Sequence, residues 1–212
     1  MTDALPRYEI VRLPFSQPIE ELSRKEARLF FYWFLEHRQE RLQQLQNAID
    51  SGRTFPFVLD FDPGKLDLLG VWLDRHTTTE PLSEELREKY RGQIGQLNSP
   101  LSSLADKLVS QPHMSEETYS LSFDLGIYFG EMLLRLFPTS EWIFPRRSPS
   151  DVAYNYPALR AGSSKRYCSP SLIARVIGSI SAERRESYKE LPRIFQVWQE
   201  YFQDWTSNKD ST

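Results

Sequence analysis

The sequence predicts one α+β domain, in which a small antiparallel sheet packs against a long N-terminal helix, a buried central helix and C-terminal helices. Apolar residues recur at helical spacing near both ends and in the middle of the chain. Between 141 and 168 the chain has short aromatic segments bounded by Pro, Gly and Ser, as antiparallel strands do. No linker separates two cores, so we expect one domain, 1–212, with loose termini at 1–18 and 206–212.

The first helix is predicted near 24–50. A capping box marks its start, because the Ser23 hydroxyl and the Glu26 carboxylate can satisfy free amide donors there. Residues 8–15, before the helix, are predicted as a short strand that Pro14 limits. The helix carries an apolar stripe, formed by Leu29, Phe30, Trp33, Phe34, His37, Leu45, Ala48 and Ile49.

Shorter elements follow the first helix. Residues 55–61 are predicted as extended, and Asp62 is the expected N-cap of a helix that runs to about Asp74. Ser83 caps a polar helix that is expected to end before Gly92. The remaining patterns here predict a loop at 77–81, a turn-rich stretch at 92–100 and a short helix near 101–109.

The central helix is predicted over 116–137, with Ser115 as its N-cap. Apolar residues cover most of its circumference, which is typical of a helix buried on several sides. Gly126 and Gly130 lie on one face, and each costs about 1 kcal/mol relative to Ala in a helix interior. We therefore expect another backbone, that of a sheet strand, to approach the helix closely at these glycines.

The last third of the chain is predicted to hold the sheet and the C-terminal helices. Strands are expected at 141–145, 152–156 and 165–168. A helix begins after Ser169-Pro170 and runs to about 180, and a polar helical stretch starts at Ser181. Pro192 opens or kinks the final helix, which ends near Trp205.

Charge and cysteine content limit the classes of function. The chain has 26 basic and 29 acidic residues, and its densest basic clusters are the pairs Arg146-Arg147 and Arg184-Arg185. This balance argues against a nucleic-acid partner, which needs a basic stripe. Cys168 is the one cysteine and no run is apolar enough to span a membrane, so we expect a cytoplasmic protein with no membrane contact.

The sequence contains no recognisable catalytic or metal-binding motif. His37, His76 and His113 stand far apart, without the close pairs that zinc sites use. Cys168 lacks the local signature of a thiol enzyme, and we interpret it as a buried structural residue. Neither a nucleophile elbow nor a phosphate-binding glycine motif is present. We expect no catalytic residue, no metal and no cofactor.

The strongest polar constellation lies on the central helix, where Asp124, Tyr128 and Glu131 share one face. One interpretation is a pocket in which Glu131 acts as acid, base or ligand anchor, with Asn155 or Arg160 arriving from the sheet. The other is a buried hydrogen-bond network, which we favour because buried polar groups are usually bonded internally. The candidate binding residues are Asp124, Tyr128, Glu131, Trp142, Asn155 and Arg160.

The final helix carries an aromatic stripe at Ile194, Trp198, Tyr201 and Trp205, widened by Phe195 and Phe202. We favour the interpretation that this stripe docks onto the core of the domain. The alternative is a surface for a partner, since Trp and Tyr are preferred interface anchors.

Four blocks of the sequence resemble a family of uncharacterised bacterial α+β proteins. The most specific block is TYSLSFDLGIYFGEMLLRLFPTSEW, within 119–142, with its Asp-x-Gly-x-Tyr-x-Gly-Glu core. The others lie at 22–45, 58–74 and 153–162. The resemblance implies a small α+β domain without an assigned chemistry, and some such bacterial proteins are regarded as toxin-neutralising immunity proteins.

Together these observations favour a non-enzymatic cytoplasmic module that binds another protein, with toxin neutralisation as its most concrete form. The alternative is a small hydrolase or ligand-binding domain with a polar pocket around Asp124, Tyr128 and Glu131. The two hypotheses differ in whether these side chains converge on an open cleft.

Overall fold

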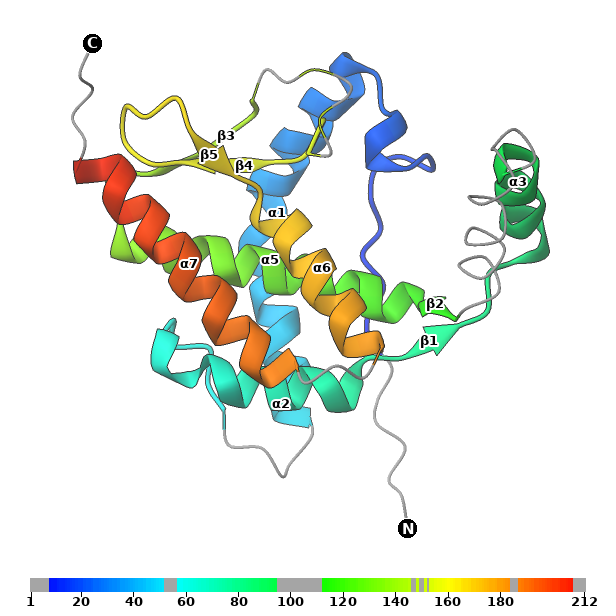
Figure 1. Ribbon diagram of the computed structural model, residues 1–212, viewed down its shortest axis with the longest axis horizontal. Coiled ribbons are helices and arrows are strands. Elements are labelled where there is room, and N and C mark those ends of the chain that lie inside the picture. The colour runs from blue at the N-terminus through cyan, green and yellow to red at the C-terminus, as the bar shows by residue number, and fades with distance from the viewer. Residues whose placement is uncertain are drawn as a thin grey trace.

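The chain folds into packed helices with a small antiparallel sheet against them, so the expected α+β class is confirmed (Figure 1). The computed structural model describes residues 8–51, 57–94, 112–145, 148, 151, 153–183 and 187–207. Its α-helices are α1 (Arg24–Ser51), α2 (Leu66–His76), α3 (Glu84–Ile94), α5 (Glu116–Leu136), α6 (Pro170–Ala182) and α7 (Ser187–Ser207). Single-turn 3-10 helices precede two of them, η1 (Ile19–Glu21) before α1 and η2 (Pro63–Lys65) before α2.

Helix α1 begins at the predicted capping box. The Ser23 N–H donates to a Glu26 carboxylate oxygen over 2.8 Å, and the Glu26 N–H donates back to the Ser23 hydroxyl over 3.4 Å. Leu29 of the predicted stripe is 52% exposed, so the buried line of α1 is narrower than the pattern indicated. That line consists of Ala27, Phe30, Phe31, Phe34, Arg41, Leu42, Leu45 and Ile49.

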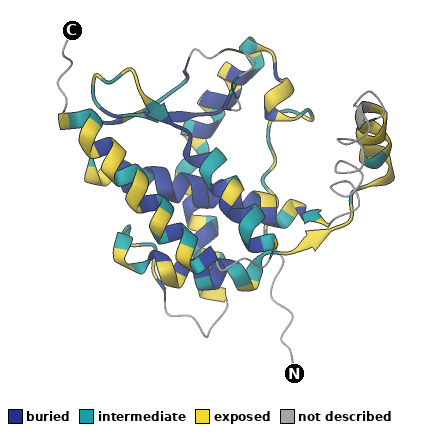
Figure 2. Cartoon of the chain, viewed as in Figure 1, coloured by how far each residue is buried: buried dark blue, intermediate teal, exposed yellow. Residues whose placement is uncertain are grey.

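Helix α5 runs through the centre of the molecule, and α6 and α1 cover opposite sides of it (Figure 1). Ser115 caps its start as predicted, accepting a hydrogen bond from the Thr118 N–H over 3.1 Å. Its residues are buried almost throughout (Figure 2). The fold therefore places many polar groups of α5 in the interior, where buried polar groups usually have hydrogen-bond partners.

The close neighbour of the α5 glycines differs from the expected sheet strand. A Cβ atom at Gly126 would lie 2.6 Å from the Cα atom of Ser171, so the backbone that approaches here belongs to α6. At Gly130 the neighbour is the indole ring of Trp142, 2.3 Å from a Cβ built there. Helix–helix contact this close requires residues without side chains. A glycine also permits close backbone contact between α2 and α7, since a Cβ atom at Gly70 would lie 2.4 Å from the Cα atom of Tyr188.

The main sheet is antiparallel, in the order β3 (Glu141–Ile143), β4 (Ala158–Arg160) and β5 (Tyr167–Cys168). A separate two-stranded ladder joins β1 (Thr79–Glu80) to β2 (His113–Met114). The predicted strand at 152–156 is wrong, because residues 153–155 form a turn. Asn155 has a φ of 69°, which an extended strand cannot accommodate, and the strand begins only at Ala158.

Other boundaries also differ from the predictions. Residues 8–15 form no strand and instead run as an irregular segment whose polar groups meet side chains. The predicted loop at 77–81 contains β1, and α3 continues through Gly92 to Ile94. The helix expected near 101–109 and most of the stretch at 92–100 lie outside the described residues.

Candidate functional site

Asp124, Tyr128 and Glu131 of α5 bond to separate partners in the described part of the chain. Asp124 meets Arg41 of α1, Tyr128 accepts a hydrogen bond from the Phe61 N–H over 3.1 Å, and Glu131 meets a third set of partners. The side chains share one face of the helix, as their spacing predicted, yet each is bonded separately. Each set of bonds links α5 to neighbouring segments, and we call each such set a tie.

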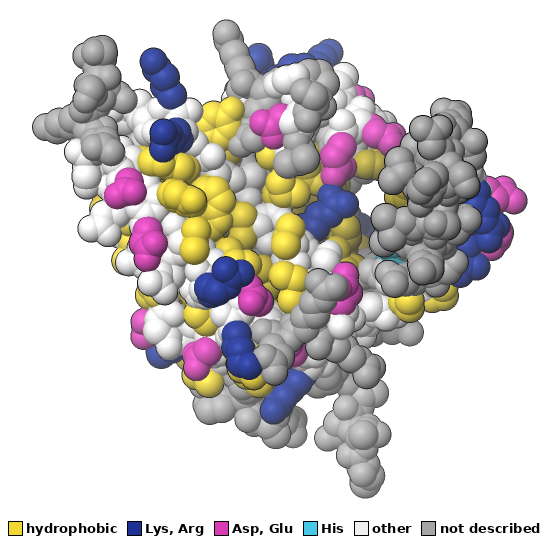
Figure 3. All heavy atoms as spheres, in the orientation of Figure 1, with side chains coloured by type: hydrophobic (Ala, Val, Ile, Leu, Met, Phe, Trp, Pro, Cys, Tyr) yellow, Lys and Arg dark blue, Asp and Glu magenta, His cyan; other side chains and the backbone are white. Residues whose placement is uncertain are grey.

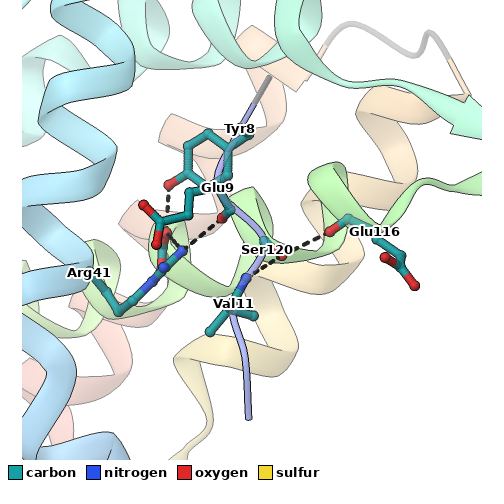
Figure 4. A network of polar contacts seen from close by, with 7 residues as sticks. Tyr8, Glu9, Val11, Arg41, Glu116 and Ser120 are labelled. Atoms are coloured by element: carbon teal, nitrogen blue, oxygen red, sulfur yellow. Dashed lines mark hydrogen bonds and ion pairs between the residues drawn. The ribbon is translucent and has the colours of Figure 1, made fainter. Parts of the chain in front are cut away.

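The tie at Asp124 is the most deeply buried. Arg41 approaches it with two donors, Nε to Oδ1 over 2.8 Å and Nη2 to Oδ2 over 2.6 Å, and the Tyr8 hydroxyl donates to Oδ2 over 2.5 Å. Arg41 is 6% exposed and Asp124 is fully buried. The same guanidinium donates to the Glu9 carbonyl over 3.3 Å, so this one ion pair also holds the N-terminal segment (Figure 4).

The electrostatics of Asp124 follow from this burial. Removal from water raises the pKa of the Asp124 carboxyl to about 6, although hydrogen bonds and charge from Arg41 act in the opposite direction. Burial beside the carboxylate also raises the pKa of the Tyr8 hydroxyl far above its ordinary value. Tyr8 is therefore a proton donor at every physiological pH, and its role here is to hold a chain segment.

Glu131 forms the second tie. Its Oε1 atom accepts from Arg38 Nη1 over 2.7 Å and from Trp142 Nε1 over 3.0 Å. The Glu131 side chain is 13% exposed, and the Trp142 ring packs edge-on against Phe34 with 4.8 Å between centroids. The carboxylate thus links α1, α5 and β3, which is an architectural position.

Asn155 and Arg160 lie apart from these ties. The buried Asn155 amide donates to the carbonyls of Ile19 and Leu22, over 3.1 and 2.7 Å, and so fixes the chain just before α1. Arg160, on β4, forms an ion pair with Glu141 on the adjacent strand β3. The structure therefore does not bring either residue to the polar face of α5.

The N-terminal segment 8–22 spans a cavity. Its first part is held at Asp124 and by the Val11 N–H, which donates to the Ser120 hydroxyl over 2.9 Å, and its last part is held by Asn155. Between these anchors lies a cavity of about 580 Å³, lined by residues 11–13 and 15–20 with Glu116, Tyr119 and Tyr156. A second cavity of about 330 Å³, lined partly by Arg175, shares Tyr119 as a wall.

A charged cluster stands at the junction of these cavities. Arg175 Nη1 donates to Glu20 over 2.6 Å and to the Tyr156 hydroxyl over 3.0 Å, and Tyr156 in turn donates to Glu20 over 2.7 Å. Burial opposes the charged form of Glu20, yet the hydrogen bonds from Tyr156 and Arg175 lower its pKa overall. The guanidinium also lies 5.0 Å from the ring centroid of Tyr119. Because each charge is already neutralised by a neighbour, the cluster has no evident substrate role.

The exposed apolar surface of α6 and α7 is the other notable feature. We define the α6–α7 face by Val176 of α6 and by Val197, Trp198, Tyr201 and Trp205 of α7. Val176 is 51% exposed, Tyr201 is 47% exposed and Val197 is 38% exposed. Figure 3 shows hydrophobic side chains gathered over these two helices, with charged side chains around them.

The aromatic stripe of α7 docks onto the core, as the favoured interpretation predicted, except at Tyr201. Phe195 and Phe202 are buried, and Ile194, Trp198 and Trp205 are partly buried and pack against the core, whereas Tyr201 is 47% exposed. The Tyr201 and Trp205 rings stack with centroids 6.0 Å apart, and Trp198 meets Tyr201 edge-on at 5.6 Å. Helix α7 thus docks through most of its stripe and leaves Tyr201 exposed at the edge of an aromatic cluster.

Sequence reasoning did not find Arg41, Tyr8 or the cluster around Arg175. An available signal for Arg41 was its position on the buried line of α1, four residues before Leu45. An arginine at such a position requires a buried acidic partner. The cluster around Arg175 had no comparable signal, because its members come from three distant segments of the chain.

Across the described ranges, 8–51, 57–94, 112–145, 148, 151, 153–183 and 187–207, no group of three or more His, Cys, Asp or Glu could hold a metal ion. Nor does this part of the chain contain a helix long and apolar enough to cross a membrane. The chain matches no protein-family model, no curated protein and no solved structure in the comparisons made with each.

Proposed function

We propose that this protein is a non-enzymatic module that binds another protein through the α6–α7 face. The observation that carries the proposal is the exposed Tyr201 side chain, which contacts the partly buried rings of Trp198 and Trp205, together with the exposed Val197 on α7 and Val176 on α6. Exposed apolar patches with polar surroundings mark interaction surfaces, and Tyr and Trp are the residues that contribute most to binding. A cytoplasmic location is part of the proposal and is supported by the lone Cys168.

Helices α6 and α7 also carry charged groups. Arg193 on α7 pairs with Glu190, and Arg175 on α6 pairs with Glu20. Charges around the apolar centre of an interface help to select partners. The rigid packing of the rings also lowers the entropy lost on binding.

Toxin neutralisation is the concrete form of this proposal, and it rests on the resemblance of the sequence to the bacterial family. Its test is co-expression with toxins encoded beside this protein's gene. Growth should be restored by the wild-type protein and lost when the α6–α7 face is altered. Absence of any neighbouring toxin gene, with no partner recovered from the host, contradicts this form.

The alternative, a hydrolase or ligand-binding domain centred on Asp124, Tyr128 and Glu131, has less support. The three side chains bond to separate partners, which argues against their acting together on one substrate. If Glu131→Gln abolished an activity while leaving the protein as stable as wild type, this alternative would replace the present proposal.

The test of the binding face compares matched substitutions. In the first variant Val176→Glu and Tyr201→Glu place charge on the α6–α7 face. In the control, Val58→Glu and Tyr32→Glu place the same charges at somewhat more exposed sites elsewhere, 64% and 59% exposed. Partner retention from host extract, followed by calorimetry with the purified partner, should be lost in the first variant and kept in the control. Equal retention by both variants would contradict the proposal.

A further inference from the structure

The main sheet has one face in the core and one face outside it. Its register pairs Leu159 with Cys168, both buried, whereas Arg160 pairs with Glu141 on one side and Tyr167 on the other. Because directly opposed residues share a face of a sheet, Glu141, Arg160 and Tyr167 lie together on the outer face. Ile143, two residues beyond Glu141, lies on that face as well.

A cavity of about 490 Å³ lies against this outer face. One side of it is apolar, formed by Ile143, Phe144 and Pro145, and the other is polar, formed by Arg160, Tyr167 and the segment 163–165 between β4 and β5. The charged groups in its wall are the cations Arg160 and Lys165, and Ser163 and Ser164 add hydroxyls. The lining residues include no carboxylate, although the whole chain has a net charge of −3.

Arg160 is incompletely bonded. Its Nη2 atom pairs with Glu141, and its side chain is 41% exposed. Its Nε atom is buried and has no hydrogen-bond partner in the described part of the chain, as is true of several other side-chain atoms there, so this donor is available to an acceptor on a ligand. A guanidinium presents its donors in a fork that matches carboxylate and phosphate oxygens.

We propose that this cavity is a binding site for a small organic anion. A phosphate or carboxylate group of the ligand lies between Arg160 and Lys165 and accepts from the serine hydroxyls. Its apolar body lies against Ile143 and Phe144. This division of the wall into a cationic end and an apolar end is the usual plan of sites for small ligands. The site is independent of the α6–α7 face and of protein binding there.

Glu141 makes the proposal sharply testable. Its carboxylate holds one nitrogen of Arg160 and repels an incoming anion, so removing its charge should strengthen anion binding while removing Lys165 should weaken it. Lys165 is exposed and belongs to no ion pair in the described residues, so Lys165→Gln does not disturb the fold. Lys25→Gln, at an exposed site on α1, is the matched control for the loss of one positive charge.

The experiment titrates the full chain with phenyl phosphate and, separately, with inorganic phosphate. Calorimetry measures affinity, and amide chemical shifts locate the site. We expect saturable binding of phenyl phosphate, weaker binding of inorganic phosphate, and shifts centred on 143 and 163–167. Lys165→Gln should weaken binding about tenfold, Glu141→Gln should tighten it several-fold and Lys25→Gln should leave it unchanged.

Three results would overturn the proposal. One is the absence of saturable phenyl phosphate binding. Another is equal binding of inorganic phosphate, which would show that the apolar wall takes no part. The third is a loss of affinity in Lys25→Gln as large as that in Lys165→Gln, which would mean that overall charge alone attracts the anion.

Discussion

Arg41 of α1 and Asp124 of α5 form a two-point ion pair, 2.8 and 2.6 Å long, in the interior of the protein. Through the same pair the segment that begins at Tyr8 is held across the helices. Charges this deeply buried are tolerated only when each completes the other's hydrogen bonds. The pair therefore fixes how the N-terminal segment, α1 and α5 are arranged.

Removing one partner of the Arg41–Asp124 pair should lower the free energy of unfolding strongly, whereas replacing both partners with apolar residues should lower it much less. Asp124→Ala leaves an unpaired buried guanidinium, and we expect a loss of about 3–5 kcal/mol in the free energy of unfolding. The double variant Arg41→Met with Asp124→Leu should recover most of that loss. Urea unfolding measures both values. A double variant no more stable than Asp124→Ala would show that the pair itself contributes net stability.

The pH dependence of stability should carry the signature of Asp124. Its pKa of about 6 exceeds the ordinary value of 3.8, so the folded state holds this proton more tightly than the unfolded chain does. Stability from this group is therefore fully present below about 3.8 and is lost as pH rises through about 6, by about 3 kcal/mol. Unfolding of wild type and Asp124→Asn across this range should differ by that amount, whereas parallel profiles would exclude the raised pKa.

Replacing a glycine by alanine should have opposite effects on stability in α5 and in α3. Gly126→Ala places a Cβ atom 2.6 Å from Ser171 Cα, and the forced separation of α5 and α6 should cost about 1–3 kcal/mol. Gly92→Ala in α3 meets no atom within 4 Å and should stabilise the protein by up to about 1 kcal/mol. Thermal unfolding of the two variants measures both changes in stability. A neutral Gly126→Ala would mean that the two helices do not pack this closely.

Glu131→Gln tests whether this residue has an architectural role. The amide keeps the shape of the side chain but weakens the bonds to Arg38 and Trp142, so we expect a loss of about 1–2 kcal/mol with partner binding unchanged. Trp142 fluorescence should shift because its indole N–H loses a charged acceptor. Glu36→Gln, at an exposed site on the same helix as Arg38, is the control and should leave both stability and fluorescence unchanged.

Local signals in the sequence predicted the helices well and the tertiary contacts poorly. Ser115 and the capping box at Ser23 located the starts of α5 and α1 because capping depends on residues a few positions apart. Spacing also placed Asp124, Tyr128 and Glu131 on one face of α5. Their partners come from other segments, and no spacing rule connects Asp124 with Arg41 or Tyr8.

The strands were harder to predict because all five in the described residues have only two or three residues and depend on turns. Aromatic alternation at 152–156 resembled a strand, but the left-handed backbone at Asn155 turns the chain there. On α7 the helical stripe was correct in period and in direction, except that Tyr201 is exposed. Spacing alone does not show which residue at the edge of a wide stripe faces solvent.

Hydrogen exchange of the full chain, measured with and without its purified protein partner, tests the proposed function most directly. Binding should slow exchange in α6 around Val176 and in α7 from Val197 to Trp205, while the exposed side of α1 near Tyr32 exchanges as before. Protection confined to α1 or to other surfaces, with α6 and α7 unchanged, would contradict the assignment of the α6–α7 face as the binding surface.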